Sequence, residues 1–300
     1  MGKLNKTLLG LAAGALVLGG LAACSPLGAL NALTPGNSLR TQAAVAYGAN
    51  ARHKLDIYRP ENASASSPVI VFFYGGNWVR GERDDYAFVG RALASRGFVV
   101  VIPDYRLYPE VKYPDFLDDS AQAVAWTARE IGSFGGDPKR LFVMGHSAGA
   151  YNAAMVALDG SYLQKQGMQA SALRGWIGLA GPYNFLPIVN PTTRPVFHHP
   201  NTPPASQPIN HVSERTPAAL LIAANKDDLV NPANNTGRLA AKLRASGVPV
   251  QEVYYDKVNH LTLVATLSAP MRALAPTLDA VEQFVKTDGG RSAVPVTAPD

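Results

Sequence analysis

The stretch RLFVMGHSAGAYNAAMVAL, residues 140–158, joins an apolar run to a segment with helical character. At the junction, Gly145 and Gly149 flank Ser147 in a G-x-S-x-G pattern. The pattern alone is weak, because small residues are common. Placed after a buried strand and before a helix, it predicts a sharp, strained turn that projects the serine hydroxyl above a sheet. Ser147 is therefore the candidate nucleophile, and His146 is interpreted as a scaffold residue.

The rest of the chain alternates β-branched or aromatic runs with amphipathic segments. Near-continuous apolar strands that alternate with helices predict an α/β fold with a mostly parallel sheet covered on both faces. Strands are expected at residues 54–60, 68–74, 97–103, 140–144, 175–181, 218–224 and 250–256. Helices are expected at residues 86–96, 114–131, 148–158, 231–247 and about 277–286.

A serine nucleophile needs a base, and the base needs a carboxylate that orients it. In a sheet of this kind both should follow later strands, in the order Ser, Asp, His. The loop after strand 218–224 carries Asp227 and Asp228; Asp227 is preferred because the apolar pair that follows can tuck under the sheet, and Asp228 is the alternative. After strand 250–256 comes His260, the only histidine beyond residue 211, and it is the predicted base.

The developing oxyanion needs hydrogen-bond donors. The segment YGGNW follows the strand at 68–74, and its glycines would let backbone N–H groups approach a substrate oxygen closely. The predicted oxyanion region comprises Gly75, Gly76 and Asn77, together with the N–H of Ala148 after the nucleophile.

These motifs together resemble the α/β-hydrolase fold, in the branch of hormone-sensitive-lipase-like, feruloyl-esterase-like and kynurenine-formamidase-like enzymes. The resemblance is carried by YGGNW (74–78), DYRLYPE (104–110), GGDPKRLFVMGHSAGA (135–150), KDDLV (226–230) and the NH pair (259–260). It covers about residues 50–287 and implies a serine hydrolase without cofactor or metal that acts on esters of small acids. One departure is Tyr74, which stands where the family usually has histidine before the two glycines and puts loop support and substrate preference in question.

The amino-terminal segment combines two lysines, an apolar stretch and the tetrapeptide LAAC. It resembles a bacterial lipoprotein signal, which implies cleavage after residue 23 and lipidation of Cys24 with fatty acyl chains such as palmitate. Ser25 after the cysteine resembles the pattern of outer-membrane lipoproteins of diderm bacteria. The alternative is an ordinary secretory signal and a released protein.

Residues 24–45 are expected to be a tether, residues 46–288 the folded domain, and residues 289–300 a frayed tail. The formal net charge is +5, with Lys and Arg scattered along the chain, so nucleic acid is not an expected partner. Cys24 is the only cysteine, which excludes an internal disulfide and a cysteine nucleophile. The expected partners are a small-molecule ester and, through the lipid anchor, a bacterial membrane.

A long Pro-rich segment at about residues 182–213 is expected to form an insertion near the site. It offers Phe185, Leu186, Val196 and Phe197 as possible acyl-pocket walls, and its His198–His199 pair lacks companions at metal-ligand spacing. Without a large apolar lid, short or aromatic acyl groups are favoured over triglycerides. The functions open to the chain are a carboxylesterase outside the cytoplasm, a formamidase-type or arylamidase-type amidohydrolase with the same triad, and a catalytically silent binding lipoprotein.

Overall fold

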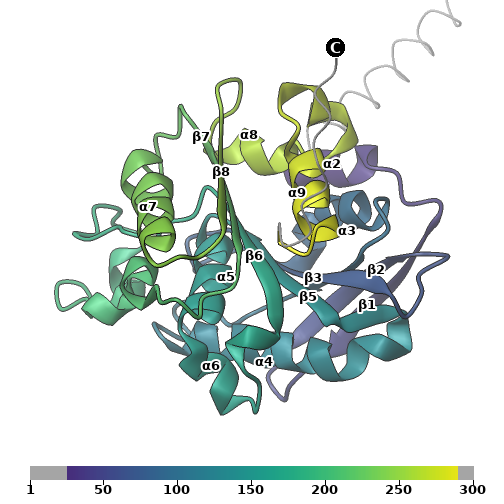
Figure 1. Cartoon of the computed structure of the whole chain (residues 1–300), viewed down its shortest axis with the longest axis horizontal. Helices are drawn as coiled ribbons and strands as arrows, with labels where there is room; N and C mark the ends of the chain where they lie inside the picture. The colour runs from purple at the N-terminus through teal and green to yellow at the C-terminus, as the bar shows by residue number, and fades with distance from the viewer. Residues whose placement is uncertain (1–25, 290–300) are drawn as a thin grey trace, which may run out of the picture.

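A single twisted sheet forms the centre of residues 26–289, the part of the chain that the computed structural model describes (Figure 1). Its strand order is β1-β2-β4-β3-β5-β6-β7-β8. Antiparallel pairing joins β1 to β2 and β2 to β4, whereas the strands from β4 through β3 to β8 are parallel. The strands are β1 (Leu39–Ala46), β2 (Lys54–Pro60), β3 (Ser67–Phe73), β4 (Val99–Pro103), β5 (Gly136–His146), β6 (Leu173–Leu179), β7 (Ala219–Ala224) and β8 (Val250–Tyr255).

Helices cover both faces of this sheet (Figure 1). One group contains α2, α3 and α9, and the other contains α4, α5 and α6. The α-helices are α2 (Pro26–Leu33), α3 (Ala87–Ala94), α4 (Asp115–Glu130), α5 (Ala148–Leu158), α6 (Gly160–Lys165), α7 (Arg238–Ala245), α8 (His260–Ala265) and α9 (Thr277–Lys286). Because both faces are covered, the central strands are buried along almost their whole length, as their continuous apolar runs predicted.

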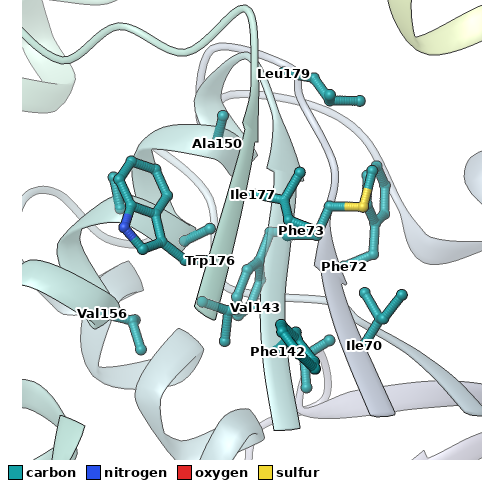
Figure 2. Packing of buried hydrophobic residues seen from close by; sticks show 14 of the residues in the cluster. Ile70, Phe72, Phe73, Phe142, Val143, Ala150, Val156, Trp176, Ile177 and Leu179 are labelled. Atoms are coloured by element: carbon teal, nitrogen blue, oxygen red, sulfur yellow. The ribbon is translucent and has the colours of Figure 1, made fainter. Parts of the chain in front are cut away.

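The core is built where β3, β5 and β6 meet the helices (Figure 2). Trp176 on β6 lies on the side of the sheet that faces α5, together with Ala150 and Val156 of that helix. On the other side, the Phe142 ring meets Phe284 of α9 edge-on, with ring centroids 6.1 Å apart. Apolar packing on both faces therefore holds β5, the strand that leads to Ser147, in place.

The predicted α/β architecture is confirmed, and each of the expected strands and helices is present. The expected helix at 231–247 starts as a π-helical turn, Ala233–Gly237, and continues as α7. Three helices, α2, α6 and α8, and the strand β1 were not predicted. Strand β1 is largely exposed, so its sequence lacks the apolar run that marks the central strands.

The prediction of a tether over residues 24–45 is wrong from residue 26 onward, because α2 and β1 belong to the folded domain. The Asn31 side chain of α2 donates to the carbonyl of Asp84 at 2.8 Å and accepts from the Phe88 N–H at 2.8 Å. Arg91 donates to the carbonyl of Asn31 at 2.7 Å. These long-range bonds, together with the packing of Leu27 and Leu30 against the core, join α2 to the folded domain.

The predicted signal segment 1–23, the predicted lipidation site Cys24 and the tail from residue 290 lie outside the described residues. Within residues 26–289, no helix has the length and hydropathy that a membrane crossing requires.

Candidate active site

Ser147 occupies the turn between β5 and α5. Its backbone angles are φ 54° and ψ −122°, a strained combination for a residue with a side chain. The Ser147 N–H donates to Leu179 O at 2.9 Å, and the Tyr151 N–H donates to Ser147 O at 3.1 Å. The strand–turn–helix context that the motif required is therefore present.

Gly145 and Gly149 of the motif allow backbone segments to pack closely around Ser147. A Cβ atom on Gly145 would lie 2.1 Å from Gly149 O, and one on Gly149 would lie 2.0 Å from Phe73 O. Any side chain at either position would push apart β5, α5 and the end of β3. The glycines thus allow the nucleophile turn to sit directly against the strand that carries the predicted oxyanion loop.

His260 lies within hydrogen-bond distance of the serine hydroxyl, with its Nε2 atom 2.8 Å from Ser147 Oγ. It is buried and is the first residue of the short helix α8. Asn259 caps this helix, because its side chain accepts the N–H groups of Leu261 and Thr262 at 3.1 and 3.0 Å. The cap fixes the backbone from which the His260 ring projects.

Asp227 holds the other nitrogen of the same ring, with Oδ2 2.7 Å from His260 Nδ1. Its Oδ1 atom accepts the N–H groups of Leu229 at 2.9 Å and Val230 at 2.8 Å. Burial acts to raise the pKa of Asp227, but the bond and charge of His260 and these two amides outweigh it, so the pKa is lowered. The neighbouring Asp228 is exposed. Of the two carboxylates left open by the sequence, only Asp227 faces the histidine.

His146 is a scaffold residue, as its place in the tight turn predicted. Its Nε2 donates to the backbone carbonyl of His260 at 2.9 Å, and the two imidazole centroids are 5.1 Å apart. Burial lowers the pKa of His146 to about 3, with the nearby His260 adding to the effect. The His146 ring is therefore neutral at physiological pH and serves as a fixed donor to the backbone of His260.

The predicted oxyanion loop follows β3 and packs directly on the nucleophile. A Cβ atom on Gly75 would lie 3.1 Å from Ser147 Cβ. Gly76 has φ 137°, and a Cβ atom there would lie 2.0 Å from Arg80 O, so only glycine fits. Asn77 also has positive φ, 54°, and lines the same pocket as Ser147 and Ala148. Because Ala148 begins α5, its N–H has no intrahelical partner and lies at the positive end of the helix dipole.

Tyr74 supports this loop from below. Its hydroxyl donates to Asp104 Oδ1 at 2.9 Å and accepts from Arg52 Nη2 at 2.8 Å. Arg52 also donates to Gly81 O at 2.8 Å, and the hydroxyl of Tyr105 donates to Tyr74 O at 2.8 Å. Hydrogen bonds therefore hold Tyr74 at its side-chain hydroxyl and at its backbone carbonyl, directly before the predicted oxyanion loop.

The family model of BD-FAE matches residues 55–243, more than half of the chain. The chain belongs to the BD-FAE family. The matched region contains the oxyanion loop, the nucleophile turn and Asp227.

Curated relatives of this BD-FAE member are named esterases. A probable isoprenylcysteine alpha-carbonyl methylesterase of Oryza sativa subsp. japonica is 35% identical over 150 residues, which are 49% of this chain and 36% of the rice protein. The esterase LipC of Mycobacterium tuberculosis is 28% identical over 221 residues, which are 67% of this chain and 54% of that protein. The chain therefore spans about a third to a half of the length of these relatives.

The solved structure of an esterase from Pyrobaculum calidifontis has the same fold. It superposes with a TM-score of 0.69 at 22% identity and covers 89% of this chain and 89% of its own. This likeness establishes the α/β-hydrolase fold of the BD-FAE member.

A pocket opens at Ser147 between the oxyanion loop, the insertion and the loop after β7. Its lining residues are Asn77, Trp78, Ser147, Ala148, Pro182, Phe185, Ile188, Val189, Asn190, Thr193, Leu229 and Val230. Of the possible acyl-pocket walls, only Phe185 lines it. Leu186 faces solvent, whereas Val196 and Phe197 are fully buried. Phe197 packs edge-on behind Trp78, with centroids 4.8 Å apart, so it supports the pocket wall without forming it.

Two asparagines that support the site were not predicted from the sequence. Asn152 on α5 accepts the indole N–H of Trp78 at 2.9 Å and thereby fixes the orientation of this pocket wall. Asn235 accepts the N–H groups of Tyr183 and Asn184 at 2.7 and 2.8 Å and anchors the start of the insertion. No local pattern marks either asparagine, because each acts on a segment at least fifty residues away in the chain.

The histidine pair of the insertion is exposed, and His198 Nε2 lies 2.7 Å from the backbone carbonyl of Tyr113. Among residues 26–289, no cluster of three or more His, Cys, Asp or Glu side chains is arranged to hold a metal ion.

Proposed function

We propose that this protein is a serine carboxylic ester hydrolase that uses Ser147, His260 and Asp227 as its catalytic triad. The observation that carries the proposal is the line of two hydrogen bonds, 2.8 Å from His260 Nε2 to Ser147 Oγ and 2.7 Å from His260 Nδ1 to Asp227 Oδ2. The triad is recognised by such geometry and not by sequence spacing. The names of the relatives support an ester as the substrate class.

In the acylation step, His260 takes the proton of Ser147 Oγ while this oxygen attacks the ester carbonyl. Asp227 keeps the Nδ1–H tautomer and stabilises the imidazolium that forms. The N–H groups of Ala148 and of Gly76 or Asn77 stabilise the oxyanion. Collapse of the tetrahedral intermediate breaks the bond to the alcohol oxygen, which receives the proton from His260.

In the deacylation step, the same histidine removes a proton from a water molecule that attacks the acyl-enzyme. A second tetrahedral intermediate then expels Ser147, which regains its proton, and the carboxylic acid leaves. No metal or cofactor enters either step.

The pocket supports short-chain or aromatic acids as acyl groups. Its walls include the indole of Trp78, the phenyl ring of Phe185 and the side chain of Ile188. None of the described residues that line it is an Asp, Glu, Lys or Arg. An uncharged acyl group therefore finds apolar contacts there, whereas a charged one would lose hydration without gaining a partner.

A fluorophosphonate probe and a panel of p-nitrophenyl esters with increasing acyl length test this function. We expect covalent labelling of wild-type protein, loss of labelling in Ser147→Ala, and a fall in turnover of about 10⁴-fold or more in that variant. Parallel assays on N-formyl and aryl amide substrates separate an esterase from a formamidase or arylamidase. Undiminished turnover by Ser147→Ala, or the absence of any labelling, would overturn the proposal.

We further propose that the enzyme acts in the bacterial cell envelope, anchored to the outer membrane through lipidated Cys24. The LAAC tetrapeptide and the following Ser25 support this location, with secretion of a released enzyme as the alternative. Metabolic labelling with a palmitate analogue should mark the wild-type protein and not Cys24→Ser. Labelling of neither protein would favour the secreted form.

A further inference from the structure

Two exposed apolar side chains line the active-site pocket, and a third directly follows His260 in the chain. Val189 of the insertion and Leu229 of the loop after β7 both line the pocket that contains Ser147. Their exposed fractions are 79% and 69%, and that of Leu261, directly after His260, is 67%. We call Val189, Leu229 and Leu261 the apolar rim. Val189 and Leu229 come from two different loops, and Leu261 is the second residue of helix α8.

Single exposed apolar residues are ordinary on protein surfaces, but their grouping around a site indicates a contact. Among residues 26–289, the large apolar side chains that are exposed are Leu33, Leu186, Val189, Leu229, Leu261 and Leu274. The rim supplies three of these, and Leu186 lies in the same insertion as Val189. Two of the six, Val189 and Leu229, therefore line the pocket that contains Ser147, and a third, Leu261, directly follows His260.

The chemistry of the triad decides which part of an ester lies beside the rim. The leaving alcohol oxygen receives its proton from His260, so the alcohol must lie on the histidine side of Ser147. Two rim residues follow the triad members on that side, Leu229 two positions after Asp227 and Leu261 one position after His260. Trp78 and Phe185, whose rings stack at 6.5 Å between centroids, form walls on the side of the oxyanion loop and the insertion.

We infer that the histidine side of the apolar rim, Leu229 and Leu261, is a binding subsite for an apolar leaving alcohol, so that the substrates are small-acid esters of lipophilic alcohols. This inference rests on the proposed ester hydrolase function and adds the chemical class of the alcohol. An alkyl or aryl chain that leaves the pocket would cover the rim side chains and remove apolar area from water. A polyhydroxylated alcohol would find neither charged nor hydrogen-bonding side chains on these three residues.

Two acetate esters with alcohol chains of equal length test the subsite. Heptyl acetate carries an apolar alcohol, and the acetate of diethylene glycol monomethyl ether carries a polar one. Below the solubility limit of both esters, the wild-type enzyme should have a higher kcat/KM for heptyl acetate. In Leu229→Ser/Leu261→Ser, the ratio of the two kcat/KM values should fall by about tenfold, because two leucines no longer contact the alkyl chain.

Leu33→Ser is the control, since Leu33 is 61% exposed and does not line the pocket. It should leave the ratio unchanged. Leu229→Thr alone should lower the ratio in the same direction as the double variant, so it tests the subsite if the double variant fails to fold. An unchanged ratio in the rim variants, or a wild-type enzyme without preference, would overturn the subsite. Failure of the proposed function is distinguishable, because neither acetate would then be hydrolysed and Ser147 would not react with a fluorophosphonate.

Discussion

The imidazole of His146 donates a hydrogen bond of 2.9 Å to the backbone carbonyl of His260. The residue next to the proposed nucleophile thus holds the backbone of the proposed base, which is more than one hundred positions away in the chain. The other ring nitrogen, Nδ1, is buried and has no hydrogen-bond partner within residues 26–289. A Cβ atom on Gly75 would lie 3.2 Å from it. His146 therefore lies between the oxyanion loop and the His260 loop and contacts both.

His146→Gln and His146→Met test this positioning role with side chains of similar length. The Gln amide can donate to His260 O, whereas Met has no donor. We expect kcat to fall by about 10- to 100-fold in His146→Met with little change in KM, because a small displacement of the base slows the chemical step. His146→Gln should recover most of the loss. Equal kcat values in the two variants would contradict the role of the hydrogen bond.

The low pKa of His146, about 3, predicts that stability falls as pH falls. In the unfolded chain this histidine titrates near its ordinary value of about 6.5. Between about pH 6.5 and 3 the unfolded state binds a proton that the folded state does not bind, so its free energy decreases relative to the folded state. Urea unfolding at pH 7 and pH 5 should show a loss of about 2 kcal/mol from this residue. His146→Gln should lose about 2 kcal/mol less than the wild-type protein between pH 7 and pH 5. An identical pH dependence of the free energy of unfolding in both proteins would contradict the low pKa of His146.

Asp227→Asn and Asp228→Asn form a matched pair of neighbouring substitutions. Only Asp227 bonds to His260 Nδ1, at 2.7 Å. Asp227→Asn should lower kcat by about 10⁴-fold, because the amide no longer selects the Nδ1–H tautomer or stabilises the imidazolium. Asp228→Asn changes an exposed side chain and should alter kcat by less than about twofold. A large effect at Asp228 would show that the loop rearranges in the working enzyme.

Tyr74→Phe removes the hydroxyl that links Asp104 to Arg52 below the oxyanion loop. Because it leaves buried polar groups without this partner, we expect a loss of about 1–3 kcal/mol in the free energy of unfolding. Activity should also fall, since Gly75 and Gly76 follow Tyr74 directly. Tyr254→Phe is the control, as its hydroxyl bonds only locally, to Glu252, on β8 at the edge of the sheet. Similar effects of the two substitutions on activity would contradict a special role for Tyr74.

Local sequence was sufficient for the features that depend on neighbouring residues. The apolar runs of β3, β5 and β7 predict buried strands because each run must leave water wherever it packs. The G-x-S-x-G motif predicts the strained turn at Ser147 because only glycines permit the backbone approach seen at Gly145 and Gly149. Ser147, Asp227 and His260 each follow a parallel strand, and they meet because the carboxyl ends of these strands share one edge of the sheet.

Only the tertiary structure decided the features that depend on contacts between distant segments. Asp227 is distinguished from Asp228 by the two amides that turn its carboxylate toward His260. The fold of α2 depends on bonds from Asn31 to residues more than fifty positions away. The apolar rim exists because the insertion and the loop after β7 line the same pocket and because α8 begins at His260, which bonds to Ser147. The sequence by itself determined the central strands and the strained turn at Ser147, since these follow from local backbone preferences and hydrophobic periodicity. The direction of each side chain and the composition of the pocket depend on contacts between segments that are far apart in the chain. No short stretch of sequence specifies those contacts.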